Sequence, residues 1–193
     1  MLNYFVHPSS VIDDGAVIGE GTSIWHFCHV MPKAIIGKGC TLGQNTFVAN
    51  NVVIGNHVKI QNNVSIYDQV ILEDNVFIGP SAVFTNVINP RSFIERKEEF
   101  KKTIIRKGAT IGANATMICG VEVGEYALVG AGSVVSKHIL AFALAMGNPA
   151  RQTGWVSEQG HRLNFDKDGN AICSGNGQGY ILRNNRVSKC NSV

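Results

Sequence analysis

Polar side chains recur in this sequence at intervals of 18 residues. One row contains Asn50, Asp68 and Asn86, and a second row contains His26, Gln44 and Asn62. Amide, carboxylate and imidazole groups in a row can hydrogen-bond a polar substrate, and an imidazole can also serve as a general base. The same residue types favour left-handed turns, where their side chains bond the local backbone. The rows therefore admit two interpretations, the margin of a substrate groove or a set of corner residues.

The cysteines and histidines do not form a recognisable metal-binding pattern. Cys173 and Cys190 have no paired neighbour, so a zinc site built from them and His161 is not expected. The chain has 5 cysteines, an odd number, and they are widely spread. This distribution indicates reduced thiols and a cytoplasmic protein.

A ladder of apolar residues must position the polar rows. From Ile12 to Phe84 every sixth residue is large and apolar, and the ladder resumes from Ile105 to Val135. A small or β-branched residue follows four places after each ladder residue, the first series ending at Ile88. A helix of 3.6 residues per turn cannot keep a period of six on one face. The ladder predicts an all-β fold, a left-handed parallel β-helix of hexapeptide repeats with three strands per coil.

Two segments fall outside the ladder. A charged stretch at about 89–103 is expected to leave the β-helix as a loop, with Asn86 at its base. Such insertions often gather on the binding face, although a solvated loop without function is the alternative. Residues 1–151 are predicted to form the β-helix domain, and residues 152–193 a small C-terminal cap.

Composition excludes several classes of partner. The chain has 193 residues and a formal net charge of +3, and no long basic block occurs in it. A nucleic-acid or anionic-membrane surface is therefore not expected. No apolar run approaches the roughly 20 residues of a membrane span. The N-terminus lacks the pattern of a signal peptide, which again favours the cytoplasm.

Five motifs carry a resemblance to a known family. They are Ile24-Trp25-His26, the run from Lys59 to Ser65, Phe84-Thr85-Asn86 with Asn89-Pro90-Arg91, Ile94-Glu95-Arg96-Lys97, and Gly147-Asn148-Pro149-Ala150-Arg151. With the ladder, the last motif resembles the left-handed β-helix acyltransferases, which use coenzyme A. The other motifs look like those of the nucleotide-sugar N-acetyltransferases of bacterial surface-polysaccharide (O-antigen) synthesis. The resemblance runs from about His7 to Trp155. It is greatest to enzymes that acetylate the 3-amino group of UDP-2-acetamido-3-amino-2,3-dideoxyglucuronate.

The resemblance implies a homotrimer that takes acetyl-CoA and a UDP-amino sugar between neighbouring prisms and requires no metal. It gives Asn86 the role of orienting the sugar amine and makes His26 a substrate contact or base. The implied sugar and diphosphate contacts are Gln61, Tyr67 and Arg91. The implied coenzyme A contacts are the backbone amides of Gly112, Ala113 and Ala131 and the side chains of Lys137 and Arg151.

Three alternatives differ from this interpretation. A dTDP-linked 3-amino-3,6-dideoxyhexose would use the same chemistry, whereas a uronate needs cations for its carboxylate, for which Arg91, Arg96 and Lys97 are candidates. A non-catalytic hexapeptide-repeat scaffold would explain the ladder but not the loop. A β-helix carbonic anhydrase needs three stacked zinc histidines, and the positions that His26 would require hold Asn62 and Tyr67.

Overall fold

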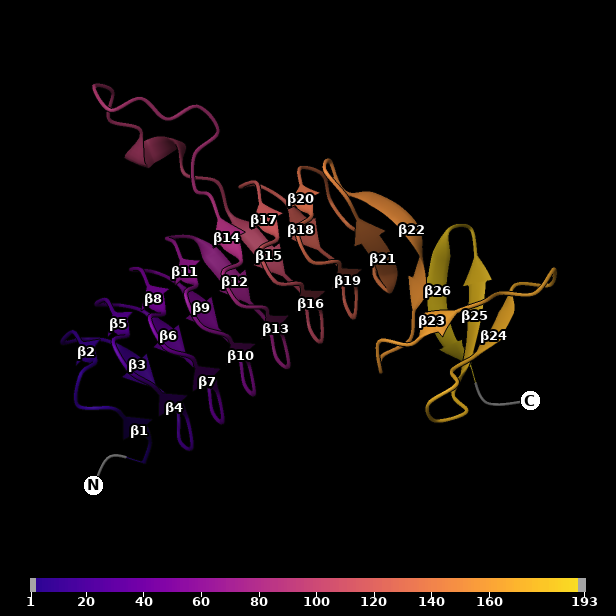
Figure 1. Ribbon diagram of the computed structural model, residues 1–193, viewed down its shortest axis with the longest axis horizontal. Coiled ribbons are helices and arrows are strands. Elements are labelled where there is room, and N and C mark those ends of the chain that lie inside the picture. The colour runs from indigo at the N-terminus through magenta and orange to yellow at the C-terminus, as the bar shows by residue number, and fades with distance from the viewer. Residues whose placement is uncertain (1–2, 191–193) are drawn as a thin grey trace.

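The chain forms a three-faced prism that ends in a small C-terminal sheet (Figure 1). The computed structural model describes residues 3–190. Short strands follow one another at six-residue intervals, and the only helix among the described residues is the single 3-10 turn η1 (Lys97–Glu99). The predicted all-β fold, a left-handed parallel β-helix of hexapeptide repeats, is confirmed. No helix in residues 3–190 is long and apolar enough to cross a membrane.

Each face of the prism is one parallel sheet. The first face contains β1 (Phe5–Val6), β4 (Ser23–Ile24), β7 (Thr41–Leu42), β10 (Lys59–Ile60), β13 (Phe77–Ile78), β16 (Thr110–Ile111) and β19 (Leu128–Val129). The second face contains β2 (Val11–Ile12), β5 (His29–Val30), β8 (Phe47–Val48), β11 (Ser65–Ile66), β14 (Val83–Phe84), β17 (Thr116–Met117) and β20 (Val134–Val135). The third face contains β3 (Val17–Ile18), β6 (Ile35–Ile36), β9 (Val53–Ile54), β12 (Val70–Leu72), β15 (Thr103–Ile105) and β18 (Glu122–Val123).

The apolar ladder fills the interior of the prism. Ile60 pairs with Leu42 in the coil before it and with Ile78 in the coil after it, so residues 18 apart lie one above the other. From Ile24 to Val135 every ladder residue is at most 1% exposed. Ile12 and Ile18 are only half-buried because no coil covers the first one. The ladder prediction is thus confirmed, and it fixes which polar residues share an edge.

The corners between faces depend on left-handed backbone. The residue three places after each ladder residue has a positive φ in nearly every coil, for example 59° at Asn45 and 60° at Asn63. Glycine and asparagine occupy most of these positions because they adopt this conformation at little cost.

The charged insertion leaves the prism between the second and third faces. Ser65 pairs with Val83 in the next coil, but Val83 pairs with Thr116, so the coil is interrupted between these strands. The expectation that the small-residue series continues to Ile88 is wrong, since Ile88 is 53% exposed. Thr103 takes that interior slot, pairing with Val70 with 0% exposure. The loop therefore starts earlier than predicted and ends before residue 103.

The C-terminal segment closes the open end of the prism. Its strands are β21 (Ala143–Met146), β22 (Arg151–Val156), β23 (Arg162–Leu163), β24 (Asn170–Ile172), β25 (Gly179–Arg183) and β26 (Arg186–Cys190). Strand β22 crosses the predicted boundary at 151/152 and pairs antiparallel with β21. Phe142 of the last coil packs with Trp155 and Tyr180 in a second apolar core. This core joins the cap to the β-helix.

We expect the ladder to dominate stability. Ile78→Ala removes a side chain with 0% exposure and should lower the free energy of unfolding by about 2–5 kcal/mol. Ile78→Val removes one methylene group and should cost about 0.5–1.5 kcal/mol. Denaturant unfolding at one fixed protein concentration measures both. Equal costs for the two variants would contradict a close-packed interior.

Candidate functional site

The predicted site residues lie on two different edges of the prism. We call the corner between the first and second faces the first edge, and the corner between the second and third faces the second edge. His26, Gln61 and Ala131 lie on the first edge, whereas Asn86 and Tyr67 lie on the second. The whole second face separates the two groups, so one copy of the chain does not bring His26 and Asn86 together.

The first edge carries a pocket of about 300 Å³. We call it the first-edge pocket; its lining residues are Trp25, His26, Thr41, Gly43, Gln44, Ile60, Gln61 and Asn62. The structure therefore brings the predicted residues His26 and Gln61 into one hollow. The His26 ring stacks on His7, with ring centroids 3.5 Å apart. No Asp, Glu, Lys or Arg side chain lines this pocket, so it suits an uncharged polar group.

Further along the first edge, backbone amides face outward. The N–H of Gln44 donates to the Asn62 side-chain oxygen at 2.9 Å, which shows how a residue one coil later can satisfy a corner amide. At Ala113 the residue in the next coil is Ala131, which has no polar side chain to do this. The N–H groups of Ala113 and Ala131 have no hydrogen-bond partner among residues 3–190. Both are available to a ligand carbonyl.

The predicted amide contact at Gly112 is wrong. The N–H of Gly112 already donates to the carbonyl of Val129 at 2.8 Å as part of the first face. The absence of a side chain at Gly112 matters for the amide of Ala131, because a Cβ at Gly112 would lie 2.5 Å from that nitrogen. A Cβ at Gly79 would likewise lie 2.5 Å from the nitrogen of Ala113. Both glycines thus leave the neighbouring amides accessible.

The second edge holds Asn86 at the base of the loop. The Asn86 carbonyl accepts a hydrogen bond from the N–H of Lys101 at 2.9 Å, which closes the loop. Tyr67 lies one coil earlier and is 39% exposed. Asp68 of the same row accepts a hydrogen bond from Asn51 at 3.1 Å, so part of this row does serve the corners. Asn86 lies one coil beyond Asp68 on this edge, as the 18-residue spacing implies, and Tyr67 directly precedes Asp68 in the chain.

Arg91 is not directed at either edge. It lies exposed in the loop, and its Nη1 donates to the carbonyl of Pro90 at 2.9 Å. No contact joins Arg91 to Asn86 or Tyr67 in the described part of the chain.

Lys137 and Arg151 line one hollow of about 180 Å³. This hollow lies where the last coil meets the cap, between the segment after β20 and the start of β22. Both side chains are exposed and cationic. The two cations in one hollow fit an anionic ligand, and their role as coenzyme A contacts stays a prediction.

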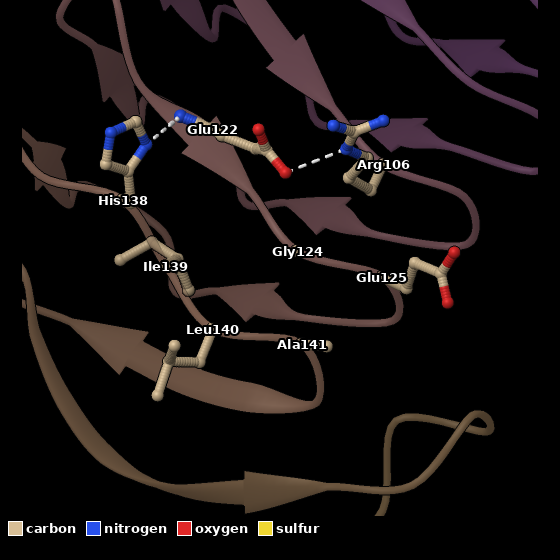
Figure 2. Close-up of a pocket in the computed structure, with 8 residues that line it drawn as sticks. All are labelled: Arg106, Glu122, Gly124, Glu125, His138, Ile139, Leu140 and Ala141. Atoms are coloured by element: carbon tan, nitrogen blue, oxygen red, sulfur yellow. Dashed lines mark hydrogen bonds and ion pairs between the residues drawn. The ribbon is translucent and has the colours of Figure 1, made fainter. Parts of the chain in front are cut away.

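A further pocket, of about 530 Å³, was not predicted from the sequence. Figure 2 shows Arg106 directed at Glu122, with His138 beside the Glu122 backbone. Arg106 Nε donates to Glu122 at 2.8 Å, and its Nη1 donates to Glu73 at 2.7 Å. The N–H of Glu122 donates to Nδ1 of His138 at 2.9 Å. These bonds from Arg106 link residues of three successive coils.

The cap places its cysteines apart from any metal-binding group. Cys173 is 1% exposed and donates to the Ser157 hydroxyl at 3.1 Å, and Cys190 ends strand β26. All five cysteines are free. Within residues 3–190 no three His, Cys, Asp or Glu side chains cluster as metal ligands would.

The chain is similar to known transferases along most of its length. A profile described as "Bacterial transferase hexapeptide (six repeats)" matches residues 15–50, 51–86 and 102–137. The dTDP-3-amino-3,6-dideoxy-alpha-D-galactopyranose 3-N-acetyltransferase of Aneurinibacillus thermoaerophilus is 48% identical over 169 residues. That alignment covers 88% of this chain and 86% of the relative.

Two solved structures share the fold. A hexapeptide-repeat acetyltransferase of Vibrio cholerae complexed with acetyl coenzyme A has a TM-score of 0.51 and 27% identity, over 60% of this chain and 70% of that one. The acetyltransferase domain of PglB from Neisseria gonorrhoeae, also with acetyl coenzyme A, has a TM-score of 0.52 and 22% identity. The second comparison covers 78% of this chain and 58% of that one, and it shows likeness of fold alone.

The Arg106–Glu122 pair should make stability depend on pH. The hydrogen bond from Arg106 lowers the pKa of Glu122 below its ordinary value of 4.5. A lowered pKa in the folded state stabilises the protein above the ordinary value, and this contribution is lost as pH falls through the lowered one. Glu122→Gln should therefore reduce the free energy of unfolding at pH 7 by roughly 0.2–1 kcal/mol.

The difference between wild type and Glu122→Gln should shrink below pH 4.5, as urea unfolding across pH would measure. Glu125→Gln is the matched control, because Glu125 lines the same pocket but makes no ion pair with another residue of 3–190. A pH-independent difference for Glu122→Gln would contradict the ion pair.

Proposed function

The chain belongs to the hexapeptide-repeat transferase family and is an acetyltransferase of nucleotide-linked amino sugars, and we propose that its substrate is a dTDP-linked 3-amino-3,6-dideoxyhexose. The 48% identity to an enzyme of that specificity, over 88% of the chain, carries this proposal. This identity favours the dTDP-linked 3-amino-3,6-dideoxyhexose over the UDP-linked uronate as the substrate.

The loop cations support the same choice. A uronate carboxylate would need a free cation, but Arg96 is paired with Glu99. Lys97 is paired with Glu95 at 2.9 Å. Arg91 donates only to the neutral carbonyl of Pro90, so two of the three cations suggested for a carboxylate are ion-paired within the loop. A 6-deoxy sugar requires no such cation.

Acetyl-CoA fits the first edge. Pantetheine carries two amide groups, whose carbonyls can accept hydrogen bonds from the N–H groups of Ala113 and Ala131. Lys137 follows β20 at the second edge and Arg151 lines the same hollow, so these cations would reach the phosphates from a neighbouring subunit.

The reaction requires positioning more than proton abstraction. A sugar amine with a pKa near ~8 is partly neutral at pH 7. Its nitrogen lone pair attacks the thioester carbonyl, a C–N bond forms, the C–S bond of the tetrahedral intermediate breaks, and the amine proton passes to the departing thiolate. The Asn86 side-chain oxygen accepts one amine N–H and thereby directs the lone pair.

A complete site would need a second copy of the chain. Asn86 and the first-edge pocket lie on opposite sides of the second face, so they would come from different subunits of a homotrimer. The third face offers a surface for such contacts, since Val17, Ile35 and Val53 are 57%, 47% and 39% exposed. Aliphatic side chains in a row favour burial against another subunit.

The free cysteines fit a cytoplasmic location.

Substrate specificity can be measured directly. Purified protein should release coenzyme A thiol from acetyl-CoA with a dTDP-3-amino-3,6-dideoxyhexose. UDP-2-acetamido-3-amino-2,3-dideoxyglucuronate should be turned over at least about a hundredfold less efficiently, since a site shaped for a 6-deoxy sugar leaves a buried carboxylate unpaired. Turnover of the uronate alone would overturn the substrate, and no turnover with either would contradict the enzymatic function.

Asn86→Ala should lower kcat/KM by at least about tenfold, because the amine loses the group that orients it. Asn50→Ala is the matched control, two coils earlier in the same row, and should retain kcat/KM within about twofold. Steady-state kinetics and the elution volume of the assembly measure the two effects separately. If both variants behave alike, the row consists of corner residues only.

His26→Ala tests whether a base takes part. Without a general base, kcat should fall less than about tenfold, whereas loss of a true base typically costs 100-fold or more. The pH dependence of kcat gives a second readout, because removing a base would abolish the acidic limb of the profile. A loss of more than 100-fold in kcat would establish His26 as the base.

A further inference from the structure

Aromatic side chains gather beside the first-edge pocket. Trp25 is 44% exposed and its ring meets that of Phe5 edge-on, with centroids 5.6 Å apart. The Trp25 and His26 rings are nearly parallel, at 7°. On the other side His26 contacts Phe27, with centroids 6.1 Å apart. The cluster presents flat ring surfaces to solvent rather than burying them.

Phenylalanine is an unusual residue type for the corner position that Phe27 occupies. It has a φ of 57°, in the left-handed region that bulky side chains rarely adopt. The equivalent first-edge positions hold Asn45, Asn63, Ser81, Asn114 and Gly132. The Phe27 ring is 61% exposed, so packing within the chain does not offset this strain. Strain without internal compensation indicates a role in binding.

The remaining wall of the pocket supplies amides. Gln44 and Gln61 present side-chain donors and acceptors, and the Nδ2 group of Asn62 has no partner among residues 3–190. A pyrimidine base has flat faces for stacking and an edge of alternating acceptors and donors, which complementary amide groups can bind. Lys59, exposed on the first face beside Thr41, is a cation within the same region.

We infer that the first-edge pocket is the nucleobase subsite, in which the pyrimidine ring of the sugar nucleotide stacks on Trp25 while Gln44 and Gln61 bind its edge, with Phe27 beside the pocket as a further ring surface. This inference rests on the proposed function and extends it to the part of the substrate that does not react. A second subunit covering the aromatic cluster is the competing occupant, and the test below separates the two.

Tryptophan fluorescence reports on this subsite without catalysis. The chain has 2 tryptophans, and Trp155 is only 8% exposed, inside the cap. Titration with dTDP alone should quench the Trp25 emission of the wild-type protein. Trp25→Phe should lose the quench and retain most of the affinity, since phenylalanine still stacks. This variant also corrects for absorption by the nucleotide.

Trp25→Ala should weaken dTDP binding by about fivefold or more, the range for losing one base-stacking partner. The KM of the sugar nucleotide should rise in parallel, whereas the KM of acetyl-CoA should stay unchanged. Ile172→Ala, which removes a 70% exposed side chain from the cap, is the control and should alter neither value.

Phe27→Asn separates a binding role from a structural one. Asparagine is the residue at three equivalent corners, so this variant should unfold at a higher temperature than wild type. It should also bind dTDP at least about threefold more weakly, because a stacking surface is lost. A purely structural Phe27 would lose stability and leave dTDP affinity unchanged.

If Trp25→Ala binds dTDP with unchanged affinity, the first-edge pocket is not the nucleobase subsite. If the wild-type protein is nevertheless fully active, the proposed function still holds. Dissociation of the assembly in Trp25→Ala, with no change in dTDP affinity per chain, identifies a second subunit as the occupant and also overturns the subsite. Wild-type protein that binds dTDP through Trp25 but transfers no acetyl group retains the subsite and refutes the proposed function.

Discussion

Stacking in register is the constraint on which the rest of this structure depends. Each coil pairs its strands with residues 18 places away, as Lys59 does with Thr41 and Phe77. Any side chain directed inward must therefore meet the same kind of side chain above and below it. A continuous apolar interior satisfies this condition at every level, and the burial of the ladder is its main source of stability. Polar groups are left to the edges, so both chemistry and solubility are decided there.

Corner positions of the prism differ in whether their backbone N–H groups are hydrogen-bonded by a side chain of the next coil. The corner amide at Gln44 is bonded by Asn62, and the corner amide of Asn56 by Asp74. On the first edge this arrangement stops at Ala113 and Ala131. An alanine that follows His26, Gln44 and Asn62 in this row looks inconspicuous in sequence, yet here it leaves an N–H donor without a partner among residues 3–190. The binding capacity of this edge thus comes from side chains that are missing as much as from those present.

The sequence was sufficient for the fold because a period of six has one regular solution. It also predicted which residues share a row. It failed where a contact depends on the length of the insertion. Glu73, Arg106 and Glu122 lie in successive coils only if the residues of the inserted loop are not counted, so the 18-residue spacing does not reveal their contacts. Ile88 fits the series of small or β-branched residues although it lies in the loop. The amide of Gly112 was misjudged because local sequence does not distinguish ladder amides from free ones.

The loop leaves and re-enters the prism at one point, where the carbonyl of Asn86 meets the N–H of Lys101. The coils on either side pair as if the insertion were absent, since β15 continues the third face directly above β12. Closing a longer or shorter loop across the same hydrogen bond changes the entropic cost only slowly with length. The scaffold can therefore exchange this segment without disturbing its own register. Divergence among such enzymes can proceed by replacing one detachable piece while the remainder of the protein is inherited intact.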